Sequence, residues 1–191
     1  MSRDPQNDLR YIKTEALIRK TFRDMLREMD YAQISIKELT DRAMINRKTF
    51  YLHYNTLDEL LGILQTELYT ELLASISDFI IPDDMEKIVW EMFTFCDKTD
   101  SINEKILCSQ GNFPVGKSRS GHARKLLFRS YYSNDMVLNR SELERNILDA
   151  YLDGGISFIY SQWIADGRSL PLEKLVRFTT DLILSGISSL S

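Results

Sequence analysis

Histidine, cysteine and glycine are scarce in this chain, which has two, two and eight of them in 191 residues. Neither His53 nor His122 lies near a cysteine or another histidine at the spacing of a metal site, so no metal or other cofactor is expected. The two cysteines, Cys96 and Cys108, are too few for a disulfide framework and are expected to be reduced thiols in the cytoplasm. With so few histidines, no Ser/His/Asp arrangement can be argued, and no enzyme is expected.

Long apolar segments are also missing. No apolar run approaches the roughly 18 residues that a membrane span needs. The first residues, "MSRDPQNDLR", lack the apolar centre of a signal peptide. We therefore expect a cytoplasmic protein with no membrane partner.

Positive charge is concentrated near the N-terminus, although the net charge of the chain is −4. Residues 1–60 contain 11 Lys and Arg against 10 Asp and Glu, whereas residues 61–191 contain 13 against 18. The stretch 42–54 contains Arg42, Arg47 and Lys48 and no acid. A local basic face on an acidic protein suits a polyanion that is contacted at one end, and a merely solvated face is the alternative.

Strand patterns are scarce, whereas apolar residues recur at three- and four-residue steps through most of the chain. The pattern predicts an all-α fold with helices over 9–29, 36–43, 47–54, 56–79, 84–98, 122–132, 141–165 and 171–190. Predicted capping residues are Ser35 with Glu38, Asn46, Thr56 with Glu59, and Ser141 with Glu144. Pro82 is expected to stop the long fourth helix, and Gly167 to end the helix that begins after Ser141.

The helix predicted over 141–165 has two apolar stripes. One contains Leu143, Ile147, Tyr151, Gly154 and Phe158, and the other contains Leu148, Leu152, Gly155, Ile159 and Trp163. A helix that is apolar on two faces is expected to be buried on two sides. We interpret the last two helices as a homodimer surface built on the monomer core, with a purely intramolecular core as the alternative.

The segment "IKELTDRA–MIN–RKTFYLHY" predicts two short helices joined by a tight turn, the helix-turn-helix layout. Ala43 supplies a small side chain where the helices cross. The second helix would present a set of cations and hydrogen-bonding groups that suits a DNA major groove: Arg47, Lys48, Thr49, Tyr51 and His53.

At these residues the chain resembles the TetR family of bacterial transcriptional regulators. "ISIKEL" and "NRKTFYLHYNTLDELL" carry the likeness, with Thr49, Tyr51, His53 and Tyr54 matching the family core T-x-Y-x-H-[FY]. The tail that begins "YLDGGISFIYSQW" resembles the regulatory domain of a Firmicutes-type subgroup. The resemblance implies a helix-turn-helix DNA-binding domain over 1–55 and a helical ligand-binding and dimerisation domain over 56–191.

The resemblance also implies roles for single residues. Ser35 and Lys37 would contact phosphate or a neighbouring base, although Ser35 has capping as its alternative. Arg47 and Lys48 would read bases, while Thr49, Tyr51 and His53 would hold the DNA backbone. His53 has helix closure and Tyr51 a half-buried position as alternatives. The chain departs from the family where Met44 replaces the usual turn glycine and Leu57 replaces a lysine.

The family further implies a homodimer on a palindromic double-stranded operator, acting as a repressor that an effector releases. An apolar effector pocket would be lined by Trp90, Phe93, Cys96, Phe128 and Tyr131, for which plain core packing is the alternative. A different function is that of a partner-dependent coactivator or interaction protein without a small-molecule effector.

One further motif, "GNFPVGKS" at 111–118, fits the phosphate-loop pattern. A working phosphate loop needs a buried strand before it, and none is predicted. We interpret 109–121 as a surface loop, with anion binding through Lys117, Arg119, Arg124 and Lys125 as an open alternative.

Overall fold

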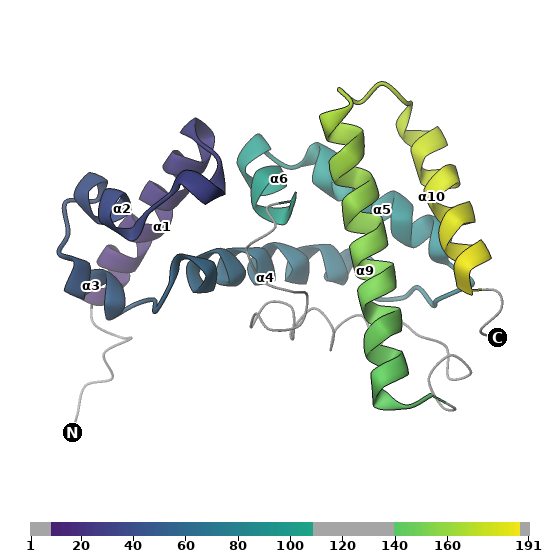
Figure 1. Ribbon diagram of the computed structural model, residues 1–191, viewed down its shortest axis with the longest axis horizontal. Coiled ribbons are helices and arrows are strands. Elements are labelled where there is room, and N and C mark those ends of the chain that lie inside the picture. The colour runs from purple at the N-terminus through teal and green to yellow at the C-terminus, as the bar shows by residue number, and fades with distance from the viewer. Residues whose placement is uncertain (1–8, 109–139, 188–191) are drawn as a thin grey trace.

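The computed structural model describes residues 9–108 and 140–187, and every regular element within these ranges is a helix (Figure 1). The predicted all-α fold is therefore confirmed. The elements are α1 (Leu9–Glu28), a 3₁₀ turn η2 (Tyr31–Gln33), α2 (Ile36–Arg42), α3 (Arg47–Tyr51), α4 (Leu57–Ser75), α5 (Met85–Lys98), α6 (Ser101–Cys108), α9 (Glu142–Ala165) and α10 (Leu172–Ile187). The predicted helix over 122–132 and loop over 109–121 lie outside the described residues.

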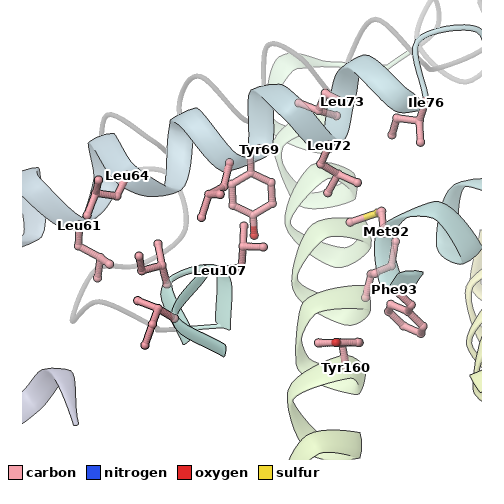
Figure 2. Packing of buried hydrophobic residues seen from close by; sticks show 14 of the residues in the cluster. Leu61, Leu64, Tyr69, Leu72, Leu73, Ile76, Met92, Phe93, Leu107 and Tyr160 are labelled. Carbon is pink, nitrogen blue, oxygen red and sulfur yellow. The ribbon is translucent and has the colours of Figure 1, made fainter. Parts of the chain in front are cut away.

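The helices form two groups that share one long element (Figure 1). α1, α2 and α3 pack at one end, and α5, α9 and α10 pack at the other. α4 runs from the first group into the second, and α6 lies against both α4 and α1. Buried apolar side chains form a single cluster through both groups, and part of it is seen along α4 in Figure 2.

Side-chain caps begin the helices where the sequence predicts them. The oxygens of Ser35, Asn46, Thr56 and Ser141 accept hydrogen bonds from backbone N–H groups two or three residues later. Of these four, Ser141 alone forms the complete reciprocal capping box, with Glu144. The carboxylate of Glu38 instead accepts a bond from Arg42, and that of Glu59 accepts bonds from Asn55.

The end of α4 differs from the prediction, because the helix stops at Ser75 and not at Pro82. Ile76 has left the helical region, with φ −112° and ψ 13°, and its N–H donates to the Leu73 oxygen at 3.2 Å. The Ser75 hydroxyl donates to the Leu72 oxygen at 2.7 Å. The last turn therefore tightens to bonds across three residues, and Ile76 is buried beyond the helix end.

α9 separates its two apolar stripes as predicted. Leu148, Leu152 and Trp163 are buried in the core, whereas Leu143 is 69% exposed and Phe158 is 57% exposed. The helix ends where Gly167 takes φ +71°, and the Arg168 N–H donates back to the Trp163 oxygen at 2.9 Å. In the exposed stripe, Tyr151 reaches α10, where its hydroxyl donates to the Leu182 oxygen at 3.4 Å, while Leu143, Ile147 and Phe158 remain largely exposed.

Candidate nucleic-acid interface

α2 and α3 are joined by a tight turn in which Met44 has φ +50°. The Met44 N–H donates to the Asp41 oxygen at 3.2 Å, and the Ile45 N–H donates to the Thr40 oxygen at 3.0 Å. These bonds satisfy the last carbonyls of α2 and reverse the chain toward α3. The helix-turn-helix geometry therefore forms although a methionine, 92% exposed, stands where the left-handed backbone favours glycine.

The inner side of this unit is apolar and aromatic. Leu39, Ala43, Phe50 and Tyr54 are buried, and the Phe50 and Tyr54 rings lie 5.8 Å apart between centroids. Because Phe50 and Tyr54 are four residues apart, they define the inward face of the segment. The opposite face of α3 then points away from the core.

Arg47, Lys48 and Tyr51 occupy that outward face of α3, and all three are exposed. No ion pair or hydrogen bond engages the side chain of Arg47 or Lys48 within 9–108 and 140–187. Leu52 lies beside them and is 74% exposed, although it is not among the residues that the sequence predicted for this face. Its position four residues after Lys48 is the sequence signal that would have placed it on this face.

Arg42 does not contribute to the basic face as the charge pattern suggested. Its Nη1 donates to Glu28 on α1 at 2.5 Å, and its Nη2 donates to Glu38 at 2.9 Å. Two carboxylates therefore neutralise this guanidinium at the C-terminal end of α2. The available cations near α3 are Lys37, Arg47 and Lys48, all exposed.

The structure places Ser35 and Lys37 at the exposed start of α2. The Ser35 Oγ accepts the Glu38 N–H at 3.2 Å, so its capping role is confirmed, while its DNA contact stays a prediction. Thr49 is half-buried on α3.

His53 is half-buried against α1. Its ring lies 4.0 Å from the Tyr11 ring between centroids, at an interplanar angle of 33°. The Nδ1 atom is buried without a hydrogen-bond partner. Burial lowers the pKa of His53 below its usual value, against an opposing effect of the nearby Glu15 carboxylate. The folded chain thus favours the neutral imidazole over the protonated one more strongly than the unfolded chain does.

Tyr54 links α3 to α1. Its buried hydroxyl accepts a bond from the Arg19 Nε at 3.0 Å and donates to the Glu15 carboxylate at 3.2 Å. Burial raises the pKa of Tyr54 to about 12, although the Arg19 guanidinium opposes the shift. Arg19 also reaches Glu67 on α4. No sequence pattern pointed to this network, because its bonded partners are up to 48 residues apart in the chain.

On the regulatory side, a small cavity of about 30 Å³ lies between α4, α5, α6 and α9. Phe93 and Cys96 line it together with Tyr69, Leu72, Met92, Leu107, Ile156, Ser157 and Tyr160, several of which Figure 2 labels. Trp90 does not; it faces a separate surface groove with Phe79 and acidic residues. Phe128 and Tyr131 lie outside the described residues, as does the segment 111–118.

α6 connects this cavity to α1 at the helix-turn-helix end. Its Leu107 lines the cavity, and its Glu104 accepts bonds from the Tyr160 hydroxyl at 2.8 Å and from Arg168 at 2.5 Å. Burial, followed by the bond to Glu104, raises the pKa of Tyr160 above its usual value. Toward α1, Asn103 accepts a bond from Arg23 at 2.6 Å, and Lys105 donates to the Leu26 oxygen at 2.9 Å.

Other kinds of site find no support in the described residues. They contain no group of three His, Cys, Asp or Glu side chains that could hold a metal ion. None of the helices over 9–108 and 140–187 has the length and apolar character to cross a bilayer.

No protein-family model matches the chain. The solved structure of a "Dihydroxyacetone kinase operon activator DhaS" aligns over 93% of this chain and 98% of that one, at 23% identity and a TM-score of 0.43. At that score the alignment adds nothing to the fold, which rests on the helices described above.

Two curated proteins are similar in sequence. The "HTH-type dhaKLM operon transcriptional activator DhaS" of Lactococcus lactis subsp. lactis (strain IL1403) is 26% identical over 178 residues, 92% of this chain and 91% of that protein. The "Uncharacterized HTH-type transcriptional regulator YxbF" of Bacillus subtilis (strain 168) is 32% identical over 83 residues, 43% of this chain and 22% of that protein. The relatives of this chain are thus helix-turn-helix transcriptional regulators and not enzymes.

Proposed function

We propose that this chain is a cytoplasmic DNA-binding transcriptional regulator of the TetR type, and not an enzyme. The observation that carries the proposal is the outward face of α3, where Arg47, Lys48 and Tyr51 project from a capped helix beside a tight turn. The size and shape of such a helix suit the major groove of B-form DNA. Similarity to regulators over most of the chain supports the same function.

In this proposal the exposed cations divide the work of DNA binding. Arg47 and Lys48, in the first turn of α3, donate to base edges, for which guanine O6 and N7 are the usual acceptors. Ser35 and Lys37, at the start of α2, contact the phosphate backbone together with Thr49, Tyr51 and His53. The Nδ1 of His53 is buried, so only its other ring nitrogen is left to reach a phosphate.

A homodimer through α9 and α10 would set two such helices on a palindromic operator, about 34–36 Å apart. Support comes from an apolar surface that these two helices leave exposed, made of Leu143, Ile147, Tyr151, Phe158, Phe178 and Leu182. Gly154, in the same stripe of α9, has only the Phe158 ring, at 4.0 Å, near the place where a Cβ would stand among the described residues, which leaves room for a partner helix. A groove of about 330 Å³ between Ile147, Tyr151 and Gly186 lies on the same surface.

Regulation would pass through α6. An effector that enters beside Phe93, Cys96 and Leu107 must displace side chains that also position α6. Because α6 is bonded to α1 through Asn103 and Lys105, its displacement would move the DNA-binding helices. The effector must bind the DNA-incompetent form more tightly, since equal affinity shifts no equilibrium.

The direction of regulation is proposed as repression, on the resemblance to the TetR family alone. The relative DhaS is named as an activator. A second candidate, regulation by a protein partner without a small-molecule effector, is favoured by the cavity volume of about 30 Å³, which is well below the roughly 300–1,000 Å³ of ligand pockets.

The test is capture of sheared genomic DNA from the source organism by the purified chain at about 150 mM salt, followed by sequencing. Enrichment of one short palindrome supports the proposed function, and the adjacent genes would indicate the effector. A folded dimer that enriches no sequence would contradict direct operator recognition.

A further inference from the structure

Leu52 is an aliphatic side chain in an unusual place, 74% exposed at the end of α3. It belongs neither to the buried cluster nor to the residues packed against that cluster. Single exposed leucines are common on protein surfaces and by themselves indicate nothing. The position of this one on α3 is what gives it meaning.

The backbone keeps Leu52 on the helical path, with φ −76° and ψ −21°, and its N–H donates to the oxygens of Thr49 and Phe50. Leu52 therefore follows Lys48 by one helical turn and lies on the same face. The fully buried Phe50 lies two positions away, which turns Leu52 almost opposite to the core. Lys48, Tyr51 and Leu52 thus form one continuous outward surface with Arg47.

The residues around Leu52 on this surface are basic. Residues 42–54 contain no acid, and Arg47 and Lys48 have no ion-pair partner among the described residues. A partner for this surface must supply negative charge and, at Leu52, an apolar contact. The major groove of DNA offers both features, because phosphates line its edges and the thymine C5-methyl group is the apolar group on its floor.

We propose that Leu52 is a specificity-determining residue that contacts a thymine methyl group in each half of the operator. The inference rests on the proposed function and adds one thymine to the bases that α3 recognises. The contacted thymine lies toward the end of the half-site that faces the C-terminal end of α3, away from the bases that Arg47 reaches. Burial of one methyl group corresponds to about a fourfold gain in affinity.

The experiment begins with selection of an operator from random duplexes by the full chain. Each thymine of the selected site is then replaced, in both halves, by deoxyuridine, which lacks only the methyl group. Dissociation constants are measured for the wild type, for Leu52→Ala, and for Leu170→Ala, a control at an exposed leucine between α9 and α10. Thermal unfolding of the three proteins checks that each one folds.

We expect one thymine position at which deoxyuridine weakens wild-type binding about fourfold for each methyl removed. Leu52→Ala should bind the thymine and deoxyuridine operators equally, and Leu170→Ala should behave as the wild type. Equal deoxyuridine effects in the wild type and in Leu52→Ala at every position would overturn the inference and leave the proposed function intact. Selection that enriches no sequence would overturn both.

Discussion

Arg19 on α1 donates two hydrogen bonds from its Nη1 to the carboxylate of Glu67 on α4, at 2.7 and 3.0 Å. The same guanidinium donates from Nε to the Tyr54 hydroxyl and from Nη2 to Glu15. One side chain thereby joins α1, the segment that follows α3, and α4. It holds the first three helices in a fixed orientation relative to α4.

Arg19→Met should lower the free energy of unfolding by about 1–3 kcal/mol, since it leaves three polar groups with fewer partners. Glu67→Gln should lower it by less than about 1 kcal/mol, because the Glu67 side chain is half-exposed. Urea unfolding of both variants measures the difference. An Arg19→Met protein as stable as the wild type would show that the network contributes orientation alone or nothing.

Met44→Gly should stabilise the fold by about 0.5–1 kcal/mol. The left-handed backbone at φ +50° costs a residue with a Cβ about 1–2 kcal/mol, and the greater freedom of glycine in the unfolded chain offsets part of that gain. Met44→Ala is the matched control, because alanine keeps the Cβ and should give no such gain. The melting temperatures of the three proteins provide the test.

Phe158→Glu should weaken the proposed homodimer at least tenfold, since a buried aromatic contact is replaced by two charges related by symmetry. Light scattering after size exclusion, over a range of concentrations, measures the association. Ile80→Glu, a change at an exposed apolar residue between α4 and α5, is the control and should stay associated. Dissociation of both variants, or of neither, would place the dimer surface elsewhere.

Arg47→Ala should cost about 1–3 kcal/mol of binding to the selected operator and relax sequence preference at one position. Lys37→Ala should weaken binding to all sequences alike. It should also reduce the salt dependence of the binding constant by about one released counterion. Titrations at several salt concentrations, on the operator and on a scrambled duplex, separate the two behaviours. A uniform loss for Arg47→Ala would make it a phosphate contact.

His53 should make the fold less stable as the pH falls. Its pKa is lowered in the folded chain, so the unfolded chain binds more protons in the window just below the ordinary histidine pKa of about 6.5. The contribution is present above that pKa and is lost as the pH falls through the lower, folded value. The stability of the wild type relative to His53→Gln should therefore decrease between pH 7.5 and pH 5, roughly the histidine range. A constant difference across that range would contradict the expected shift.

Local sequence signals predicted the described helices except α6 (Ser101–Cys108), because caps and apolar spacing act over a few residues. Ser35, Asn46, Thr56 and Ser141 all begin helices as expected. The predicted end of α4 was wrong, because a helix-breaking residue such as Pro82 sets only the latest position at which a helix can end.

The candidate site was predictable in part. The outward positions of Arg47, Lys48 and Tyr51 follow from helical spacing, and so would that of Leu52. The neutralisation of Arg42 by Glu28 could not be read from the chain, because the two residues meet only through the packing of α2 on α1. The same holds for Trp90, which the fold separates from Phe93 although they are three positions apart.

α4 contributes buried side chains to one continuous hydrophobic core. Its Leu60, Leu61 and Leu64 and its later Leu68, Leu72 and Leu73 belong to one cluster, which also contains Phe22 and Phe50 at one end and Phe93 and Val176 at the other. If the chain were divided at residue 56, the predicted boundary between the two domains, the first three helices would lose the α4 side chains that complete their core. The two groups of helices therefore form one cooperative folding unit, and heating should unfold them in a single transition.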